Sequence, residues 1–430
     1  MSRHHAALPP KAPQMNRSKL LFVTPWEPQP TGGGPAIRAY HSLLALSELY
    51  DPHVLVLGHY ENSRLAGPPR ELRQARWEHV RVRSFLTRRG RSLRILDDLS
   101  AALYSRFYEQ PSEWRFATAG AIQRAAEAFK GVPFDLVHVH RLFSVPFVQS
   151  YLSSDRAPLR TQLDLEQIES YTRWRTASLY EANGNKLRAW RLMHDAEQYR
   201  RIEKTELSQW DRLYVSSDLA VDRLRKLTGV GEVEVLPNVI DDFAPDRDSD
   251  QTPDPFTFLF VGQLGYYPNA DAVRFFIRNV WPHVAQWAGQ EVRFDVIGYD
   301  ASESLIEEVE TTPGAQWIGP VEDVRRYYAH ADAAVAPIRA GGGTHIKVVE
   351  AFAHRVPVVA TSIAAEGLDV AAERHLLVAD SPLRFAQSCV RLIEKPELRN
   401  WLRENASRLY REAYLPKAMR QVLLKSISNY

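Results

Sequence analysis

Short apolar runs alternate with amphipathic segments along the first half of the chain. The first run, Lys19–Pro25, leads into the loop TPWEPQPTGGGP and then into Ala36–Tyr50, whose apolar residues recur at helical spacing. Further strands are predicted at His53–Gly58, His79–Phe85, Phe134–His140, Leu159–Leu165 and Arg212–Ser217, and further helices at Glu113–Lys130, Lys186–Gln209 and Asp218–Leu227. This alternation favours a parallel sheet that is covered by helices on both faces.

A second series of the same kind begins at Phe256, after the stretch DFAPDRDSDQTPDP, whose Asp and Pro content is typical of a solvated linker. Strands are predicted at Phe256–Leu264, Val292–Gly298, Ala315–Ile318, Ala333–Ile338, Val356–Thr361 and His375–Ala379, and helices at Asn269–Ala288, Ser302–Thr311, Asp323–Ala331, Thr344–Arg355 and Ser381–Glu394. The residues from Pro396 to Tyr430 read as helix with a break at Pro416. The pattern therefore predicts an α/β protein with two parallel-sheet domains.

The length of 430 residues agrees with two domains. We expect a flexible tail at 1–17, an N-terminal domain at 18–240, a linker at 241–255, a C-terminal domain at 256–400, and a helical segment at 401–430 that is able to pack back on the N-terminal domain. These boundaries follow the composition shifts between the two series.

Charge and cysteine content exclude several classes of protein. The net charge of +2 does not suggest a general nucleic-acid binder, and the single cysteine, Cys389, rules out an internal disulfide and a cysteine metal cluster. Without an apolar run of about 18 residues, we expect a cytoplasmic protein. The basic stretch 70–94 has two open interpretations, a solvated surface or contact with anionic lipid at the inner membrane face or with a phosphate-bearing acceptor.

The most informative segment is RAGGGTHIKVVEAFAHRVPVVAT, which follows the predicted strand Ala333–Ile338. Three glycines, of which Gly342 and Gly343 are the last two, precede a helix that we expect to begin near Thr344. A loop without side chains lets backbone N–H groups approach a phosphate, and a helix N-terminus favours negative charge. Lys347 in the first turn can add a full charge, and Glu350 can accept hydroxyl groups. The alternative is a plain turn before a capped helix with a Lys–Glu pair.

This segment resembles the C-terminal signature of glycosyltransferase family 4, the glycosyl transferases group 1 of GT-B fold. In that family two glutamates stand eight positions apart, before a small-residue helix and a strand like Pro357-Val358-Val359. Here Glu350 matches the second acid, whereas Gly342 replaces the first, as in a variant subgroup with a GGGTxxK loop. The resemblance implies GT-B architecture, with two Rossmann-like domains facing each other across a cleft.

Other positions match the family more loosely. The resemblance gives Glu350, Lys347 and His140 catalytic roles, and it assigns donor binding to Gly33, Gly34, Gly262, Gln263, Asn269, Gly298, Gly319, Val321, Gly342, Gly343 and Thr344. Gln263 and Asn269 stand where the family has Arg and Lys, so two cationic contacts to the donor are missing. Weaker matches place Arg38, Asp164 and Glu166 at the acceptor. The structural alternatives also stay open: a buried histidine at 140, a cap at Asn269 and turns at the glycines.

The function implied by the resemblance is transfer of a sugar from a nucleoside-diphosphate sugar to a glycan, lipid-linked or small-molecule acceptor, as in polysaccharide biosynthesis. Retention of the anomeric configuration, no metal and no cofactor are implied as well. Two alternatives share the architecture: a nucleotide-sugar epimerase, and a degenerate protein that binds a nucleotide sugar without turnover. A nicotinamide-dependent oxidoreductase fits less well because TGGGPAIR lacks the Gly-X-Gly-X-X-Gly spacing.

Overall fold

The computed structural model describes residues 17–58, 67–82, 100–153, 157–242, 255–289 and 291–428. The predicted tail at 1–17 and linker at 241–255 lie almost wholly outside these residues, and so do positions 83–94 of the basic stretch 70–94. Across the described ranges, no helix combines the length and the apolar composition that are needed to cross a bilayer.

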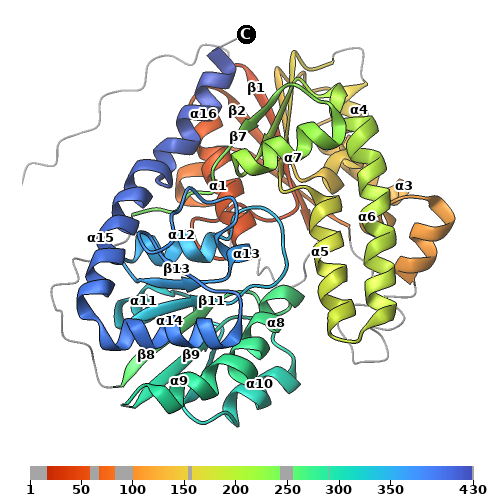
Figure 1. The fold of residues 1–430 in the computed structure, drawn as a ribbon. Coiled ribbons are helices and arrows are strands. Elements are labelled where there is room, and N and C mark those ends of the chain that lie inside the picture. The colour runs from red at the N-terminus through yellow and green to blue at the C-terminus, as the bar shows by residue number, and fades with distance from the viewer. Residues whose placement is uncertain are drawn as a thin grey trace, which may run out of the picture.

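Two parallel sheets, one in each domain, organise the described residues (Figure 1). The N-terminal sheet has seven strands in the order β3-β2-β1-β4-β5-β6-β7, and the C-terminal sheet has six in the order β10-β9-β8-β11-β12-β13. The strands are β1 (Lys19–Thr24), β2 (Asp51–Gly58), β3 (Arg76–Arg81), β4 (Leu136–His140), β5 (Arg160–Glu166), β6 (Arg212–Val215), β7 (Val233–Val235), β8 (Phe256–Val261), β9 (Val292–Ile297), β10 (Ala315–Gly319), β11 (Ala333–Ala336), β12 (Val358–Ala360) and β13 (Leu377–Val378). The predicted fold class, with two Rossmann-like domains, is confirmed.

Helices cover the faces of both sheets (Figure 1). Those of the N-terminal half are α1 (Gly34–Leu46), η1 (Arg70–Leu72), η3 (Ser112–Phe116), α3 (Ala119–Ala128), η4 (Leu142–Phe147), α4 (Gln149–Leu152), α5 (Glu169–Ala182), α6 (Lys186–Glu206), η5 (Leu207–Gln209) and α7 (Asp218–Thr228). Those of the C-terminal half are α8 (Tyr267–Phe275), η6 (Phe276–Val280), α9 (Trp281–Trp287), α10 (Glu303–Glu310), α11 (Arg325–His330), α12 (Ile346–Ala353), α13 (Ser362–Ala365), α14 (Pro382–Glu394), α15 (Pro396–Ala413) and α16 (Pro416–Ser428).

Side-chain alternation along β1 explains why its whole run is apolar. Leu20 and Phe22 belong to the core cluster on one face of the N-terminal sheet, whereas Leu21 and Val23 belong to the cluster on the other face. Successive side chains of a strand point to opposite faces, so a strand with helices on both sides must be apolar at every position.

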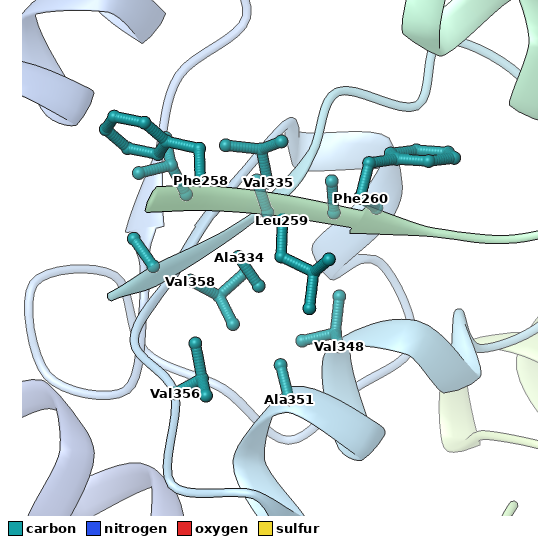
Figure 2. Packing of buried hydrophobic residues seen from close by; sticks show 14 of the residues in the cluster. Phe258, Leu259, Phe260, Ala334, Val335, Val348, Ala351, Val356 and Val358 are labelled. Atoms are coloured by element: carbon teal, nitrogen blue, oxygen red, sulfur yellow. The ribbon is translucent and has the colours of Figure 1, made fainter. Parts of the chain in front are cut away.

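The packing of α12 on the C-terminal sheet fixes which side of that helix faces outward. Figure 2 shows Leu259 and Ala334 pointing toward Val348 and Ala351 of α12, while Phe258 lies on the opposite face of the sheet. Because Val348 and Ala351 are fully buried against the sheet, residues 347 and 350 lie on the adjacent, less buried flank of the helix.

Two predicted helices differ in the structure. The prediction of one helix over Glu113–Lys130 is wrong, because Thr118 adopts an extended conformation, caps the N-terminus of α3 and separates it from η3. The helix expected over Asn269–Ala288 contains a π-helical segment, η6, just before Pro282. Since proline cannot donate to the preceding turn, the regular α-helical bonding is interrupted there.

The α5 helix is missing from the predicted elements. Its buried positions include Glu169, Ser170, Thr172 and Thr176, so it lacks the apolar stripe by which amphipathic helices are recognised. It lies beside α6, and the two helices extend from the N-terminal sheet toward α8 of the other domain (Figure 1).

The chain returns to the N-terminal domain between α15 and α16, rather than at the predicted residue 401. Leu402 and Tyr410 of α15 belong to the C-terminal core, whereas Met419 and Leu423 of α16 belong to the core beneath β1 and α1 (Figure 1). Pro416 begins α16 where the backbone changes direction.

Both sheets have a topological switch point, where the strand order reverses between β1 and β4 and between β8 and β11. Ligands of open α/β sheets bind outside the carboxyl ends of the strands at such points. The loops that leave β1, β4, β8 and β11 are therefore the first places to look for a site.

Candidate functional site

A cavity of 470 Å³ opens between the carboxyl edges of the two sheets. Both domains line it, through the loops after β1, β4 and β5 and helix α5 on one side and the loops after β8, β9, β10 and β11 on the other. The predicted site residues that line it are Gly33, Gly34, Glu166, Gly262, Gln263, Asn269, Gly298, Val321, Gly342, Thr344, Lys347 and Glu350. Those that do not line it are Arg38, His140, Asp164, Gly319 and Gly343.

Lys347 projects into the cavity from the first turn of α12. Its Nζ donates a hydrogen bond to Asn269 Oδ1 at 2.8 Å and stands 4.0 Å from the centre of the Phe260 ring. Asn269 is itself held by the bond from its Nδ2 to the Gln263 carbonyl oxygen at 2.8 Å. Burial lowers the Lys347 pKa to about 7, although Glu350 acts in the opposite direction. An anion in the cavity would therefore restore the charge of this ammonium group.

Glu350 lies one turn further along the same side of α12. Its Oε2 accepts a hydrogen bond from the buried Tyr328 hydroxyl at 3.0 Å. Burial raises the Glu350 pKa to about 7, against the effects of Tyr328 and Lys347. A buried carboxyl group that keeps spare acceptor capacity toward a cavity is suited to bind hydroxyl groups of a ligand.

The helix begins at Ile346 and not at the predicted Thr344. The N–H of Thr344 donates to Ser216 Oγ at 3.1 Å, and its hydroxyl oxygen accepts from Asn238 Nδ2 at 2.8 Å. Both partners belong to the N-terminal domain, so Thr344 joins the two domains. The Thr344 amide is therefore already bound within the protein, although Thr344 lines the cavity, and the amides in the first turn of α12 remain for a phosphate.

Glycines 262 and 298 permit a close approach of two strand ends. A Cβ at Gly298 would lie 2.0 Å from the Gly262 carbonyl oxygen, and a Cβ at Gly262 would lie 3.0 Å from Lys347 Nζ. Position 298 is therefore closed to side chains, and a side chain at 262 would have to displace Lys347 or Asn269, so the two glycines leave bare backbone beside the ammonium group.

The N-terminal glycine loop lies against the opposite domain. A Cβ at Gly33 would stand 3.2 Å from the Tyr299 hydroxyl, and a Cβ at Gly34 would stand 3.1 Å from Ile346 Cγ2. The loop after β1 thus covers the entrance of α12, as expected for a cleft that is closed by contact between the domains.

Arg38 and Asp164 form a buried pair away from the cavity, which corrects their predicted place at the acceptor. Arg38 Nε donates to Asp164 Oδ2 at 2.8 Å and Nη2 to Oδ1 at 2.7 Å. Arg38 Nη1 also donates to Asn238 Oδ1 at 2.9 Å, so the pair supports the hinge segment. The register of β5 shifts between Asp164 and Glu166, where Glu166 adopts φ 61°. This irregularity separates the two carboxylates, and only Glu166 reaches the cavity.

Sequence reasoning missed the wall that the ends of β4 and β5 build with α5. Arg141, with φ 73°, donates through Nη1 to Glu166 Oε2 at 2.9 Å and through Nη2 to Glu169. Arg173 pairs with Glu113 at 2.5 Å. Arg141 directly after β4 and Glu166 at the end of β5 both have left-handed backbone, a strained conformation for residues other than glycine. The available signal was the charged residue after each buried strand, in LVHVHR and LDLE.

His140 stands behind this wall rather than in the cavity. Its Nε2 is 3.5 Å from Glu166 Oε2, and its ring lies 5.8 Å from the Trp26 ring. Burial would raise the Glu166 pKa, but the adjacent His140 and Arg141 lower it to about 2. The predicted catalytic histidine is thus placed to act through Glu166.

Ion pairs and stacked rings join the two domains beside the cavity. Arg175 of α5 and Arg223 of α7 both bind Glu366, which follows α13, with contacts of 2.8 Å and 2.7 Å. Farther along α5, the Tyr180 ring stacks on Tyr267 with centroids 3.7 Å apart. These contacts hold the N-terminal helices on the C-terminal domain.

Among the described residues, no group of three or more His, Cys, Asp or Glu side chains is arranged to hold a metal ion. Lys347 lies in the first turn of α12 and lines the cavity, and the helix N-terminus adds a partial positive charge there.

Comparison with known proteins agrees with this geometry. Residues 255–395 match the family described as glycosyl transferases group 1. The search of curated proteins gave no match for the chain. Among solved structures, the chain is similar to sucrose-phosphate synthase from Thermosynechococcus elongatus, with a TM-score of 0.69, 15% identity and coverage of 96% of this chain and 99% of that one.

Two further solved structures are similar over nearly their whole length. HepE from Anabaena, in complex with UDP and glucose, has a TM-score of 0.64 and 14% identity, and the match covers 96% of this chain and 100% of that one. A glycosyltransferase from Rickettsia africae has a TM-score of 0.61 and 12% identity, with coverage of 96% and 98%. This protein therefore has the GT-B fold, and its residues 255–395 are similar to the glycosyl transferases group 1 family.

Proposed function

We propose that this protein is a glycosyltransferase that moves a sugar from a nucleoside-diphosphate sugar to a sugar-bearing acceptor. The observation that carries the proposal is the placement of Lys347 and Glu350 on the cavity side of α12, where the carboxyl edges of the two sheets meet. The match of residues 255–395 to glycosyl transferases group 1 supports the same assignment.

The donor diphosphate binds at the start of α12 in this proposal. The first-turn amides of a helix have no partner within the helix, and the helix end carries about half a positive charge. Lys347 adds a full charge when an anion binds beside it, and Gly262 and Gly298 leave backbone without side chains in the same place. Positive groups aimed at the departing diphosphate stabilise the charge that develops there.

Glu350 positions the donor. Its carboxylate accepts hydroxyl groups of the ribose or of the transferred sugar, and the bond from Tyr328 holds it in place. This role is one of orientation, which raises the rate by holding the anomeric carbon close to the acceptor oxygen.

The transfer breaks the bond between the anomeric carbon and the diphosphate oxygen, which keeps the electron pair. The acceptor oxygen forms the new bond to the anomeric carbon, and its proton goes to the departing diphosphate. We propose retention of configuration and no requirement for a metal ion, because Lys347 and the helix amides supply the positive charge at the leaving group.

A donor screen followed by a transfer assay tests the proposal. UDP, GDP and ADP and their common sugar derivatives are first compared by thermal shift. The best donor, labelled in its sugar, is then incubated with glucose, sucrose and short glycans, with and without EDTA. We expect acceptor-dependent release of the nucleoside diphosphate, unchanged by EDTA, and a product whose anomeric proton couplings in NMR match those of the donor.

The second candidate is a protein that binds a nucleotide sugar without turnover. It is favoured by Gly342, which stands in place of an acid and has no room for a side chain. Nucleotide binding with no transfer to any acceptor would support this candidate over the transferase. Conversion of the donor into a second nucleotide sugar without an acceptor would instead point to an epimerase, and release of the nucleotide without an acceptor would point to a hydrolase.

A further inference from the structure

The N-terminal wall of the cavity is a continuous lattice of carboxylates and guanidinium groups. Arg141 bridges Glu166 and Glu169. Arg173 bridges Glu169 and Glu113, with 3.7 Å between Arg173 Nε and Glu169 Oε2. All five side chains line the cavity. Each guanidinium group is therefore already paired with two carboxylates of the protein.

The wall carries an excess of negative charge. It holds three carboxylates and two guanidinium groups, which leaves a net charge of −1. The pKa of Glu166 is lowered to about 2, so this carboxylate stays ionised throughout the neutral range. A phosphate group here would meet carboxylates first, and repulsion between like charges is strong where water is excluded.

Two donors in the wall, the Nε–H groups of Arg141 and Arg173, have no hydrogen-bond partner among the described residues. Arg141 is only 8% exposed, yet its Nε lacks a hydrogen-bond partner among the described residues. A buried donor that borders a cavity needs a ligand atom or water to satisfy it, and a hydroxyl oxygen fulfils that need. The neighbouring carboxylates can in turn accept the hydroxyl protons.

Aromatic side chains complete the same part of the cavity. Trp26 and Phe143 come from the N-terminal domain and Tyr266 from the C-terminal domain, and all three line the cavity. The Arg141 guanidinium lies 5.6 Å from the centre of the Trp26 ring. Flat apolar rings beside charged hydrogen-bonding groups match a sugar, which has apolar C–H faces and a rim of hydroxyls.

We infer that this wall, built by Glu113, Arg141, Glu166, Glu169 and Arg173, is the acceptor subsite and that it selects an uncharged sugar over one that bears a phosphate. The inference rests on the proposed transferase function and adds the class of acceptor. Lys347, on the opposite side of the cavity, favours phosphate. The charges of the two sides therefore favour the donor diphosphate beside Lys347 and the neutral hydroxyl groups of the acceptor at the wall.

Paired acceptors test the inference. Glucose, mannose, fructose and N-acetylglucosamine are each compared with their own monophosphate ester, with the donor chosen by thermal shift. For the pair that is used best, we expect kcat/KM to favour the neutral sugar by at least about 100-fold, as expected for an unfavourable placement of like charges.

A charge-neutral variant links the selection to the wall. Glu169→Gln keeps the shape and removes the excess negative charge, so the ratio of kcat/KM values should fall at least about tenfold. Glu181→Gln, at an exposed position on the same helix, serves as the matched control and should leave the ratio unchanged. The affinity for the nucleoside diphosphate of the chosen donor is measured for each variant, since unchanged affinity shows that the fold and the donor side are intact.

The outcomes separate this inference from the proposed function. Equal use or preferred use of the phosphate ester, or an unchanged ratio in Glu169→Gln, would overturn the acceptor assignment while leaving the transferase intact. No transfer to either member of any pair, with UDP still bound, would also overturn it. If no nucleoside diphosphate binds at all, the proposed function fails and the acceptor assignment fails with it.

Discussion

Gly342 and Thr172 touch across the interface of the two domains: a Cβ at position 342 would lie 2.0 Å from the Thr172 hydroxyl oxygen. In the family that the sequence resembles, an acid stands at the position of Gly342. Here helix α5 occupies the space that such a side chain would need, so the absence of the acid and the closeness of α5 are one structural feature.

Gly342→Ala should therefore loosen the contact between the domains. Overpacking of this kind costs about 1–3 kcal/mol, and turnover should fall because the cavity no longer closes. The double variant with Thr172→Ala removes the clashing oxygen and should recover at least half of the lost stability. Urea denaturation and donor consumption provide the readouts. A Gly342→Ala variant that matches the wild type in both would show that α5 is not packed on this loop.

Glu366 should act as a latch between the domains. It receives hydrogen bonds from both Arg175 and Arg223, and although burial acts in the opposite direction, these bonds lower its pKa to about 2. Its stabilising contribution is therefore present above the ordinary glutamate pKa and is lost as the pH falls through about 2.

Glu366→Gln should open the cleft at neutral pH, with a larger radius of gyration in small-angle scattering and kcat/KM lower by about tenfold. Glu373→Gln is the matched control, because Glu373 forms a similar pair with Arg391 within a single domain. Equal scattering curves for the two variants would show that Glu366 does not hold the two domains together.

Glu350→Gln should make the protein more stable and less active. The folded-state pKa of Glu350 is raised to about 7 by burial, so its stabilising contribution is present below the unfolded pKa and is lost as the pH rises through about 7. Above that pH the wild type buries an ionised carboxylate that the amide variant lacks. We expect a gain of about 1–3 kcal/mol in unfolding free energy near pH 8.

The same Glu350→Gln substitution should lower kcat/KM by about 100-fold, because one of the hydroxyl acceptors for the donor becomes an amide oxygen. Denaturation and kinetics at the same pH measure both effects. A variant that is less stable and fully active would place Glu350 in the framework of the domain instead of the site.

The sequence was most informative where the residues of the site are close together in the chain. Gly342, Lys347 and Glu350 lie within nine positions, so strand, loop and helix periodicity alone predicted that they would be near one another. The two sheets were predicted for a similar reason, because each buried strand is a local apolar run.

The parts that escaped prediction depend on contacts between distant residues. The N–H of Thr344 is bound by Ser216, which is 128 positions away, and Arg38 meets Asp164 across 126 positions. The left-handed backbone at Arg141 carries no local signature, since this conformation is normally marked by Gly or Asn. The contribution of α5 to the wall was likewise not predicted, because many of its buried positions are polar.

Proton uptake on nucleotide binding tests the central assignment most directly. Because burial lowers the Lys347 pKa to about 7, most of this side chain is neutral near pH 8, and a diphosphate bound beside it should restore the charge. Calorimetric titration of UDP, GDP and ADP in two buffers of different ionisation enthalpy measures the protons exchanged. For the nucleotide that binds, the account predicts uptake of about one proton near pH 8.

In that titration, Lys347→Met should lose the uptake and bind at least about tenfold more weakly, whereas Lys204→Met, an exposed control on α6, should behave as the wild type. Binding without proton uptake in the wild type, or equal affinity and uptake in Lys347→Met, would contradict the assignment of the donor diphosphate to the entrance of α12.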